Sequence, residues 1–213
     1  MKAIALLSLF LLATACQSPP AAPAGRSSES VEPPPLLLFT GSSSIRLWKS
    51  LALDFPDFLT INTGFGGSQF SDLIAAQDTA IFLYQPEVLF VYEGDNDLAL
   101  GKSVEATLND ARVLVTEVRQ RLPDTQLVLI SPKPSPARWK LRQEYQSLNE
   151  ALQALCASDE QVHFIDMWPL MLKENGRVNG NLFIQDSLHM NAEGYVRWQE
   201  AVLGWLDAWK ASR

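Results

Sequence analysis

From residue 36 onward, short apolar runs of strand length alternate with longer stretches in which apolar residues recur every three or four positions. The short runs are typical of buried strands and the longer stretches of amphipathic helices. Because each run is nearly continuous in apolar residues, we expect strands covered on both faces. Strands that alternate with helices pair in parallel, so the sequence predicts an α/β sandwich with a five-stranded parallel sheet between helical layers. The five runs are residues 36–40, 59–63, 88–92, 127–131 and 162–166.

Three of the intervening stretches have a clear helical period, at residues 104–122, 141–155 and 195–209. The last of them places Trp198, Trp205 and Trp209 at helical spacing. We expect this aromatic face to pack on the sheet rather than to bind a ligand. A chain of 213 residues is long enough for one such domain and too short for two.

The N-terminal segment has a different composition. Lys2 precedes an apolar run at 3–12, and the small residues at 13–15 precede Cys16, which predicts a secretory signal peptide. A cysteine directly after such a site resembles the bacterial lipobox, and this resemblance implies that Cys16 is acylated. An ordinary secretory cleavage site is the alternative. Residues 17–35 are rich in Pro, Ala and Ser and predict a disordered tether.

We therefore expect a signal peptide at 1–15, a lipid anchor and tether at 16–35, and one globular domain at 36–213. Gln17, rather than Asp, follows the anchor. In lipoproteins of the enteric type this resembles an outer-membrane address, so we expect a bacterial envelope protein that faces the periplasm and contacts the membrane through its lipid.

Charge and cysteine content narrow the possible partners. The chain has 17 basic and 24 acidic residues and a formal net charge of −7, so it should not bind nucleic acid. If Cys16 is acylated, Cys156 has no partner for an internal disulfide, and its place in an apolar helical stripe predicts a buried thiol. His163 lies within the fifth apolar run and is expected to be structural.

Polar loops follow the predicted strands. Ser43 follows the first strand, Gly67 the second and Asn96 the third, while Asp186 and His189 stand just before the last helix. In an open parallel sheet, ligands bind where loops leave the carboxyl ends of the strands. We therefore expect these five residues to converge on one rim of the sheet.

These residues suit acyl transfer, which needs a nucleophile, a base, a group that orients the base and donors for an oxyanion. Ser43 would open a helix, where its own N–H is favourably placed for an anion. His189 is a candidate base, and Asp186 lies three positions before it. Gly67 and Asn96 could supply further N–H donors. Each feature alone also fits an ordinary turn or cap.

The order of these loops resembles the SGNH, or GDSL-like, hydrolase family. Three longer strings are similar to a subgroup of acylhydrolases related to platelet-activating-factor acetylhydrolase: GSSSIRLW at 41–48, YEGDNDL at 92–98 and SPKPSPARW at 131–139. The resemblance spans residues 36–209 and implies a flavodoxin-like SGNH hydrolase fold. It also implies a reaction without a metal ion or organic cofactor.

By this resemblance Ser43 is the nucleophile, and His189 and Asp186 complete a catalytic triad. The N–H groups of Ser43 and Gly67 and the Asn96 amide form the oxyanion hole. The sequence departs from the family pattern at two positions. Ser42 replaces the usual Asp before the nucleophile, and Asp95 introduces a carboxylate that is expected to alter the hydrogen bonds around Asn96.

The expected function is hydrolysis of a small acyl ester, with acetyl as the candidate acyl group, on an envelope carbohydrate or lipid. The loops at 133–139 and 173–182 are expected to shape the pocket. One alternative is a catalytically silent lipoprotein that binds a glycan or a partner through the same rim. Another is a metal-dependent hydrolase, although the spacing of its candidate ligands is not characteristic of a metal site. Those ligands would be Asp95, Asp97, Asp186 and His189.

Overall fold

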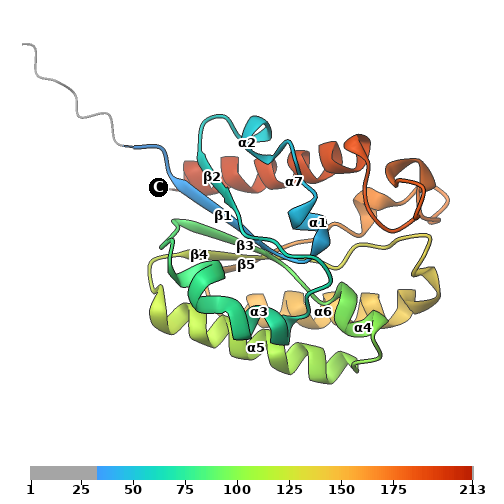
Figure 1. Cartoon of the computed structure of the whole chain (residues 1–213), viewed down its shortest axis with the longest axis horizontal. Coiled ribbons are helices and arrows are strands. Elements are labelled where there is room, and N and C mark those ends of the chain that lie inside the picture. The colour runs from blue at the N-terminus through green and yellow to red at the C-terminus, as the bar shows by residue number, and fades with distance from the viewer. Residues whose placement is uncertain (1–32, 213) are drawn as a thin grey trace, which may run out of the picture. The chain divides into compact units, whose positions relative to one another are not determined.

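The computed structural model describes residues 33–212, which form a five-stranded parallel sheet with the order β2-β1-β3-β4-β5. This is the flavodoxin-like order, and it confirms the predicted fold class. The sheet lies between two layers of helices (Figure 1). The strands are β1 (Leu36–Gly41), β2 (Leu59–Asn62), β3 (Val88–Tyr92), β4 (Gln126–Ile130) and β5 (Val162–Ile165).

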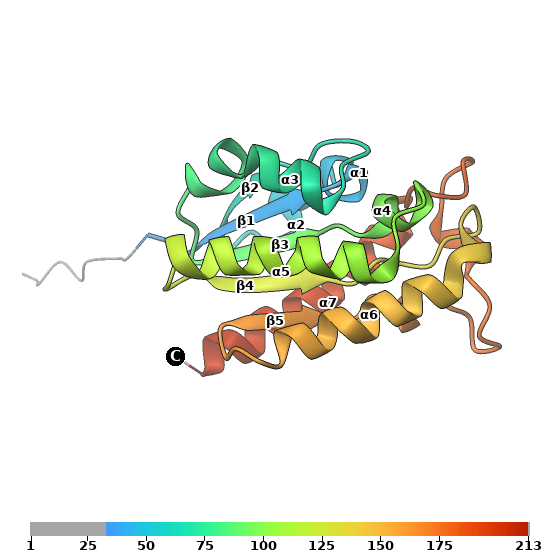
Figure 2. The ribbon, with the colours of Figure 1, turned by 90° about the horizontal axis from the view of Figure 1, so that it is seen from below.

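The helices divide between the two faces of the sheet. One face carries α1 (Ser43–Arg46), α2 (Leu51–Asp54) and α7 (Ala192–Ala211). The other carries α3 (Phe70–Gln77), a π-helical turn (Asp78–Phe82), α5 (Val104–Arg121) and α6 (Arg142–Cys156), as Figure 2 shows. The short α4 (Asp95–Ala99) follows β3. Three 3₁₀ turns complete the fold, at Trp139–Leu141, Pro169–Met171 and Gly180–Leu182.

Alternation along the strands builds two separate cores. In β3, Phe90 and Tyr92 face the α7 side, whereas Leu89 and Val91 face α5 and α6. All four are almost fully buried, as expected for a strand that is covered on both faces. β2 is different, because it is one of the two edge strands and Leu59 is 54% exposed. The prediction of two-sided burial was therefore wrong for this strand.

The aromatic face of α7 packs on the sheet, as predicted. Trp198 is fully buried, and its ring centroid lies 4.9 Å from that of Tyr92. Trp205 meets the β3 ring of Phe90 edge-on at 5.7 Å. Replacing a fully buried Trp with Ala typically costs about 3–5 kcal/mol, so this face stabilises the layer that carries α7.

The structure bears out both predictions for residues outside the site. Cys156 is buried, and burial raises the pKa of its thiol to about 12, so it is not a thiolate at neutral pH. His163 pairs its Nε2 with the side-chain oxygen of Gln126 at 2.7 Å and lies against Trp205. Neither residue contacts the predicted catalytic loops.

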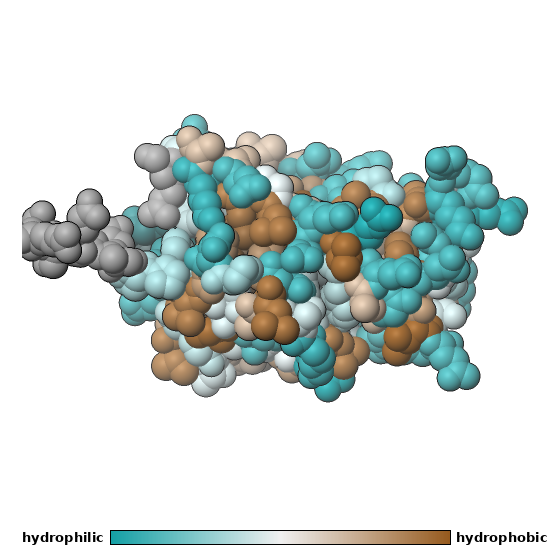
Figure 3. Space-filling view, turned by 90° about the horizontal axis from the view of Figure 1, so that it is seen from above, coloured by the Kyte–Doolittle hydropathy of each residue, from teal (hydrophilic) through white to brown (hydrophobic). Residues whose placement is uncertain are grey.

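The surface over α2 and α7 shows separate hydrophobic patches among hydrophilic residues (Figure 3). Leu53 and Val196 are among the exposed apolar side chains of these helices. No helix within residues 33–212 is long and apolar enough to cross a membrane. The predicted signal peptide, Cys16 and nearly all of the predicted tether lie outside the described residues.

Candidate active site

Three predicted residues meet at the rim of the sheet. Oγ of Ser43 lies 2.9 Å from Nε2 of His189, and Nδ1 of His189 lies 2.6 Å from Oδ2 of Asp186. Ser43 and His189 are 146 residues apart in the sequence. The fold therefore joins a serine, an imidazole and a carboxylate into one continuous hydrogen-bonded chain.

Ser43 lies where β1 turns sharply into α1. Gly41 has φ +122°, and a Cβ there would come within 2.1 Å of the Tyr92 carbonyl oxygen, so only glycine lets β1 pass so close to β3. The Ser42 N–H donates to the same carbonyl at 3.0 Å. Ser42 and Ser44 are each 2% exposed, whereas Ser43 is half-buried and faces His189. Among the three consecutive serines, only Ser43 presents its hydroxyl to the imidazole.

Asp186 holds the loop that carries His189. Its Oδ1 accepts the N–H groups of Leu188 and His189, each at 2.9 Å. Slight burial opposes ionisation, but the hydrogen bonds from the ring and backbone of His189 lower the pKa of Asp186 to about 2. A charged Asp186 favours the tautomer with a proton on Nδ1, which leaves Nε2 free to accept the Ser43 proton.

The three predicted oxyanion donors follow three neighbouring strands, β1, β2 and β3. The Ser43 N–H opens α1, where helical N–H groups have no intrahelical acceptor. Gly67 has φ +81°, and open space lies where a side chain would project. Asn96, in α4, is 8% exposed and donates one amide proton to the Ser68 carbonyl at 2.8 Å. This bond joins the Asn96 amide to the residue that follows Gly67.

Asp97 connects α4 to α3 through hydrogen bonds. It accepts the N–H groups of Gly94 and Phe70, at 3.2 and 3.3 Å, and pairs with Lys102 at 2.9 Å. Asp95 is likewise occupied, by Lys133 and Arg138. Within residues 33–212, no group of three or more His, Cys, Asp or Glu residues is arranged to hold a metal ion. Two of the four candidate metal ligands, Asp95 and Asp97, are engaged in ion pairs.

Glu93 is a buried acid that the sequence analysis missed. It is 1% exposed, and its Oε1 lies 2.6 Å from Oγ of Ser68. The Ser68 hydroxyl has a single proton and also contacts the Phe65 carbonyl at 3.1 Å. A protonated Glu93 can donate to Ser68, which leaves the Ser68 proton for Phe65. Burial raises the pKa of Glu93 well above its usual range, in agreement with a neutral carboxyl.

We expect Glu93→Gln to stabilise the protein at neutral and alkaline pH. A raised folded-state pKa contributes stability that is complete below the unfolded pKa and is lost as pH rises through the folded value. Gln has nearly the same shape as a protonated Glu and is neutral at every pH. In urea unfolding, the free energy of unfolding of the variant should exceed that of the wild type by about 1 kcal/mol or more near pH 8, and the two should differ little near pH 4. Equal pH dependence in the two proteins would contradict a neutral Glu93.

Two surface loops border a cavity of about 400 Å³. One loop contributes Pro136 and Trp139, and the other contributes Arg177 and Val178. The Ala137 N–H donates to the Ser187 carbonyl at 3.0 Å, so the first loop lies directly beside the Asp186–His189 turn. Residues of the 133–139 and 173–182 loops thus line one cavity together, but none of the predicted catalytic residues lines it. That these loops shape the substrate pocket stays a prediction.

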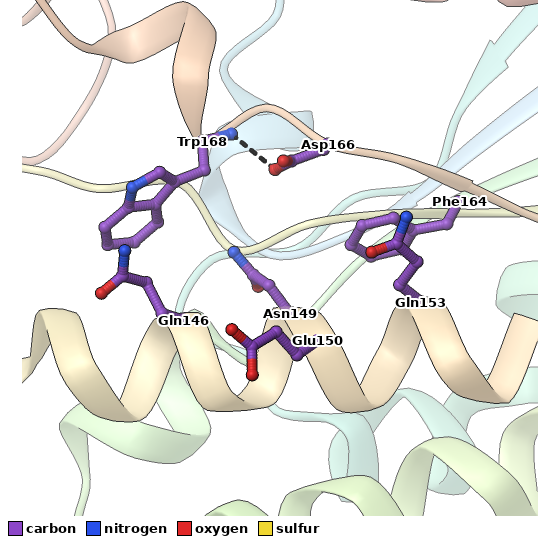
Figure 4. A pocket seen from close by; sticks show the side chains of 7 residues that line it. All are labelled: Gln146, Asn149, Glu150, Gln153, Phe164, Asp166 and Trp168. Carbon is purple, nitrogen blue, oxygen red and sulfur yellow. Dashed lines mark hydrogen bonds between the residues drawn. The ribbon is translucent and has the colours of Figure 1, made fainter.

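A smaller cavity of about 150 Å³ lies between α6 and the end of β5 (Figure 4). The Trp168 N–H donates to Oδ1 of Asp166 at its margin. None of the predicted catalytic residues lines this cavity. Its lining residues are Gln146, Asn149, Glu150, Gln153, Phe164, Asp166 and Trp168.

Comparison with known proteins identifies the family of this chain. Residues 36–197 match the model of the GDSL-like lipase/acylhydrolase family. The human platelet-activating factor acetylhydrolase IB subunit alpha1 is 25% identical over 181 residues, which cover 79% of this chain and 74% of the human protein. The family-model match, at 36–197, spans the positions of all five predicted site residues.

Solved structures share the fold. A protein from Streptococcus pneumonia named for platelet activating factor superposes with a TM-score of 0.73 at 24% identity, covering 84% of this chain and 86% of that protein. A catalytic mutant of an acetylxylan esterase from Geobacillus stearothermophilus gives a TM-score of 0.67 at 15% identity, covering 79% and 92%. At these identities the likeness concerns the architecture.

Proposed function

Because the chain belongs to the GDSL-like lipase/acylhydrolase family and is an SGNH-type esterase, we propose that Ser43, His189 and Asp186 hydrolyse a small acyl ester. The observation that carries this proposal is the hydrogen-bonded chain from Ser43 Oγ through His189 to Asp186. Such a chain supplies a nucleophile, a base and a group that orients the base.

In the proposed reaction, Ser43 Oγ attacks the ester carbonyl carbon while Nε2 of His189 takes the hydroxyl proton. The N–H groups of Ser43 and Gly67 and the Asn96 amide stabilise the negative oxygen of the tetrahedral intermediate. The intermediate collapses as His189 gives its proton to the leaving alcohol, and an acyl-serine remains. Water then attacks the acyl-serine with His189 as base, which releases the acid and restores the serine.

We propose an acetyl or similarly short acyl group, carried on a carbohydrate or lipid of the cell envelope. The names of the human relative and of the Geobacillus esterase both denote the removal of acetyl groups. The cavity of about 400 Å³ beside the Asp186–His189 turn could accept part of such a substrate.

A panel of p-nitrophenyl esters of rising chain length tests this function, alongside acetylated xylooligosaccharides. We expect the highest kcat/KM for the acetyl ester. A fluorophosphonate should add one mass label, on the peptide that contains Ser43. If the protein neither turns over an ester nor reacts with the fluorophosphonate, the alternative of a catalytically silent binding lipoprotein is supported instead.

We also propose that Cys16 anchors the protein to the periplasmic face of the outer membrane. The proposal rests on the small residues before Cys16 and on Gln17 after it. Cys16→Ser should move the protein to the soluble periplasmic fraction with its esterase activity unchanged, because the tether separates the anchor from the catalytic domain. Fractionation and intact-mass analysis measure this outcome. A wild-type protein that is soluble and carries no acyl mass would contradict the anchor.

A further inference from the structure

Arg138 links the side chains of the first two residues of α4, Asp95 and Asn96. Its Nη1 donates to Oδ1 of Asp95, and its Nη2 donates to Oδ1 of Asn96 at 3.0 Å. Arg138 lies in the loop after β4, 42 positions from Asn96. Because the guanidinium is a rigid planar fork, fixing one of its arms on Asp95 also fixes the other on Asn96.

The Asp95 carboxylate that binds this guanidinium is itself held in place by several hydrogen bonds. Its carboxylate is 6% exposed and also accepts hydrogen bonds from Tyr92, Lys133 and Tyr145. Burial alone would raise the pKa of Asp95, but the charges of Lys133 and Arg138 and these hydrogen bonds lower it to about 2. Asp95 therefore remains an anion across the working pH range of an esterase, and Arg138 stays paired with it.

Hydrogen bonds at both ends of the Asn96 amide define its orientation. The Arg138 guanidinium donates to the amide oxygen, and the Ser68 carbonyl accepts one amide proton at 2.8 Å. An amide nitrogen has two protons, so the second stays available for a substrate oxygen. Without the guanidinium, the amide could rotate and present its oxygen, which repels an oxyanion, in place of its nitrogen.

We propose that Asp95 and Arg138 are positioning residues that hold the Asn96 amide with its N–H toward the oxyanion. This inference rests on the proposed function, because it needs Asn96 to be an oxyanion donor. It gives the string at 131–139 a role in catalysis, and it makes Asp95 a support for the oxyanion hole.

A double-mutant cycle with Asn96→Ala tests the proposal. Asn96→Ala should lower kcat on p-nitrophenyl acetate by about 10²- to 10³-fold, the usual effect of losing one oxyanion donor. Arg138→Ala should lower kcat by about 10- to 100-fold with little change in KM, because the donor is misaligned rather than absent. In the double variant, Arg138→Ala should cost no more than about threefold beyond Asn96→Ala.

Two further variants separate positioning from charge and from stability. Arg138→Lys keeps a cation beside Asp95 but has one nitrogen in place of the two that Arg138 uses for Asp95 and Asn96, so it should be almost as slow as Arg138→Ala. If Arg138→Ala does not fold, as judged by its thermal transition, Arg138→Lys alone and combined with Asn96→Ala completes the same cycle. Arg142→Ala, whose side chain lies against Trp139, is the matched control and should keep wild-type kcat.

The outcomes distinguish this inference from the function on which it rests. Additive losses in the double variant, or wild-type kcat in Arg138→Lys, would overturn positioning while leaving the esterase mechanism intact. Full activity in Asn96→Ala would instead show that Asn96 is not an oxyanion donor, and it would overturn the positioning role of Asp95 and Arg138 as well. Added guanidinium that restores kcat in Arg138→Ala, but not in the double variant, would support the proposal directly.

Discussion

Ser43→Ala is expected to reduce ester hydrolysis by at least about 10⁴-fold, because the hydroxyl that points at His189 is the nucleophile of the proposed catalytic triad. The fold should survive, since Ser43 is half-buried and its hydroxyl contributes little to packing. We expect the free energy of unfolding to change by less than about 0.5 kcal/mol. Steady-state kinetics and urea unfolding measure the two effects separately.

The neighbouring serines provide matched controls for this experiment. Ser42→Ala and Ser44→Ala should keep most of the activity, because both side chains are buried and neither contacts the imidazole. A variant of Ser42 or Ser44 that is inactive and well folded, beside an active Ser43→Ala, would show that the nucleophile has been assigned to the wrong serine.

Asp186→Asn is expected to lower kcat by about 10²-fold, near the low end of the range for catalytic triads. Asn has a similar shape, but its amide nitrogen cannot accept the Nδ1 proton and can stabilise the wrong tautomer of His189. The Asp186 side chain is 43% exposed, so water can replace part of its effect, which is why we expect the smaller loss. Asp186→Glu, which keeps the charge, is the control and should lose less.

The pH profile provides a second measure of the same pair. Wild-type kcat/KM should fall on the acid side, because Nε2 of His189 must be unprotonated to accept the Ser43 proton. Asp186 cannot cause this decline, since its pKa is about 2 and it stays ionised from about pH 5 to 8. Full activity in Asp186→Asn together with a flat profile from about pH 5 to 8 would remove both residues from the mechanism.

Sequence periodicity was sufficient to predict the central strands and the long helices. The predicted run at 88–92 coincides with β3, and α5 and α6 begin and end within one residue of their predicted limits. The short helices α2, α3 and α4 were not predicted, because stretches of 4 to 8 residues are too short to show a helical period. The exposure of β2 depended on its place at the edge of the sheet, which local sequence does not encode.

The five proposed catalytic residues could be predicted because they stand in loops that must share one edge of a parallel sheet. That rule needs only the order of strands along the chain. It predicted that Ser43 and His189 lie close together although they are 146 positions apart. In the structure, Oγ of Ser43 is 2.9 Å from Nε2 of His189.

The sequence by itself therefore determined the fold class and the set of candidate catalytic side chains, because periodicity and loop position are local properties of the chain. Only the tertiary structure decided which of the charged residues around them form ion pairs and which are buried in a neutral form. Arg138 and Asp95 are separated by 43 positions, and Glu93 lies 25 positions from Ser68. Burial determines whether such charges pair or stay neutral, and burial is known only once distant segments have packed together.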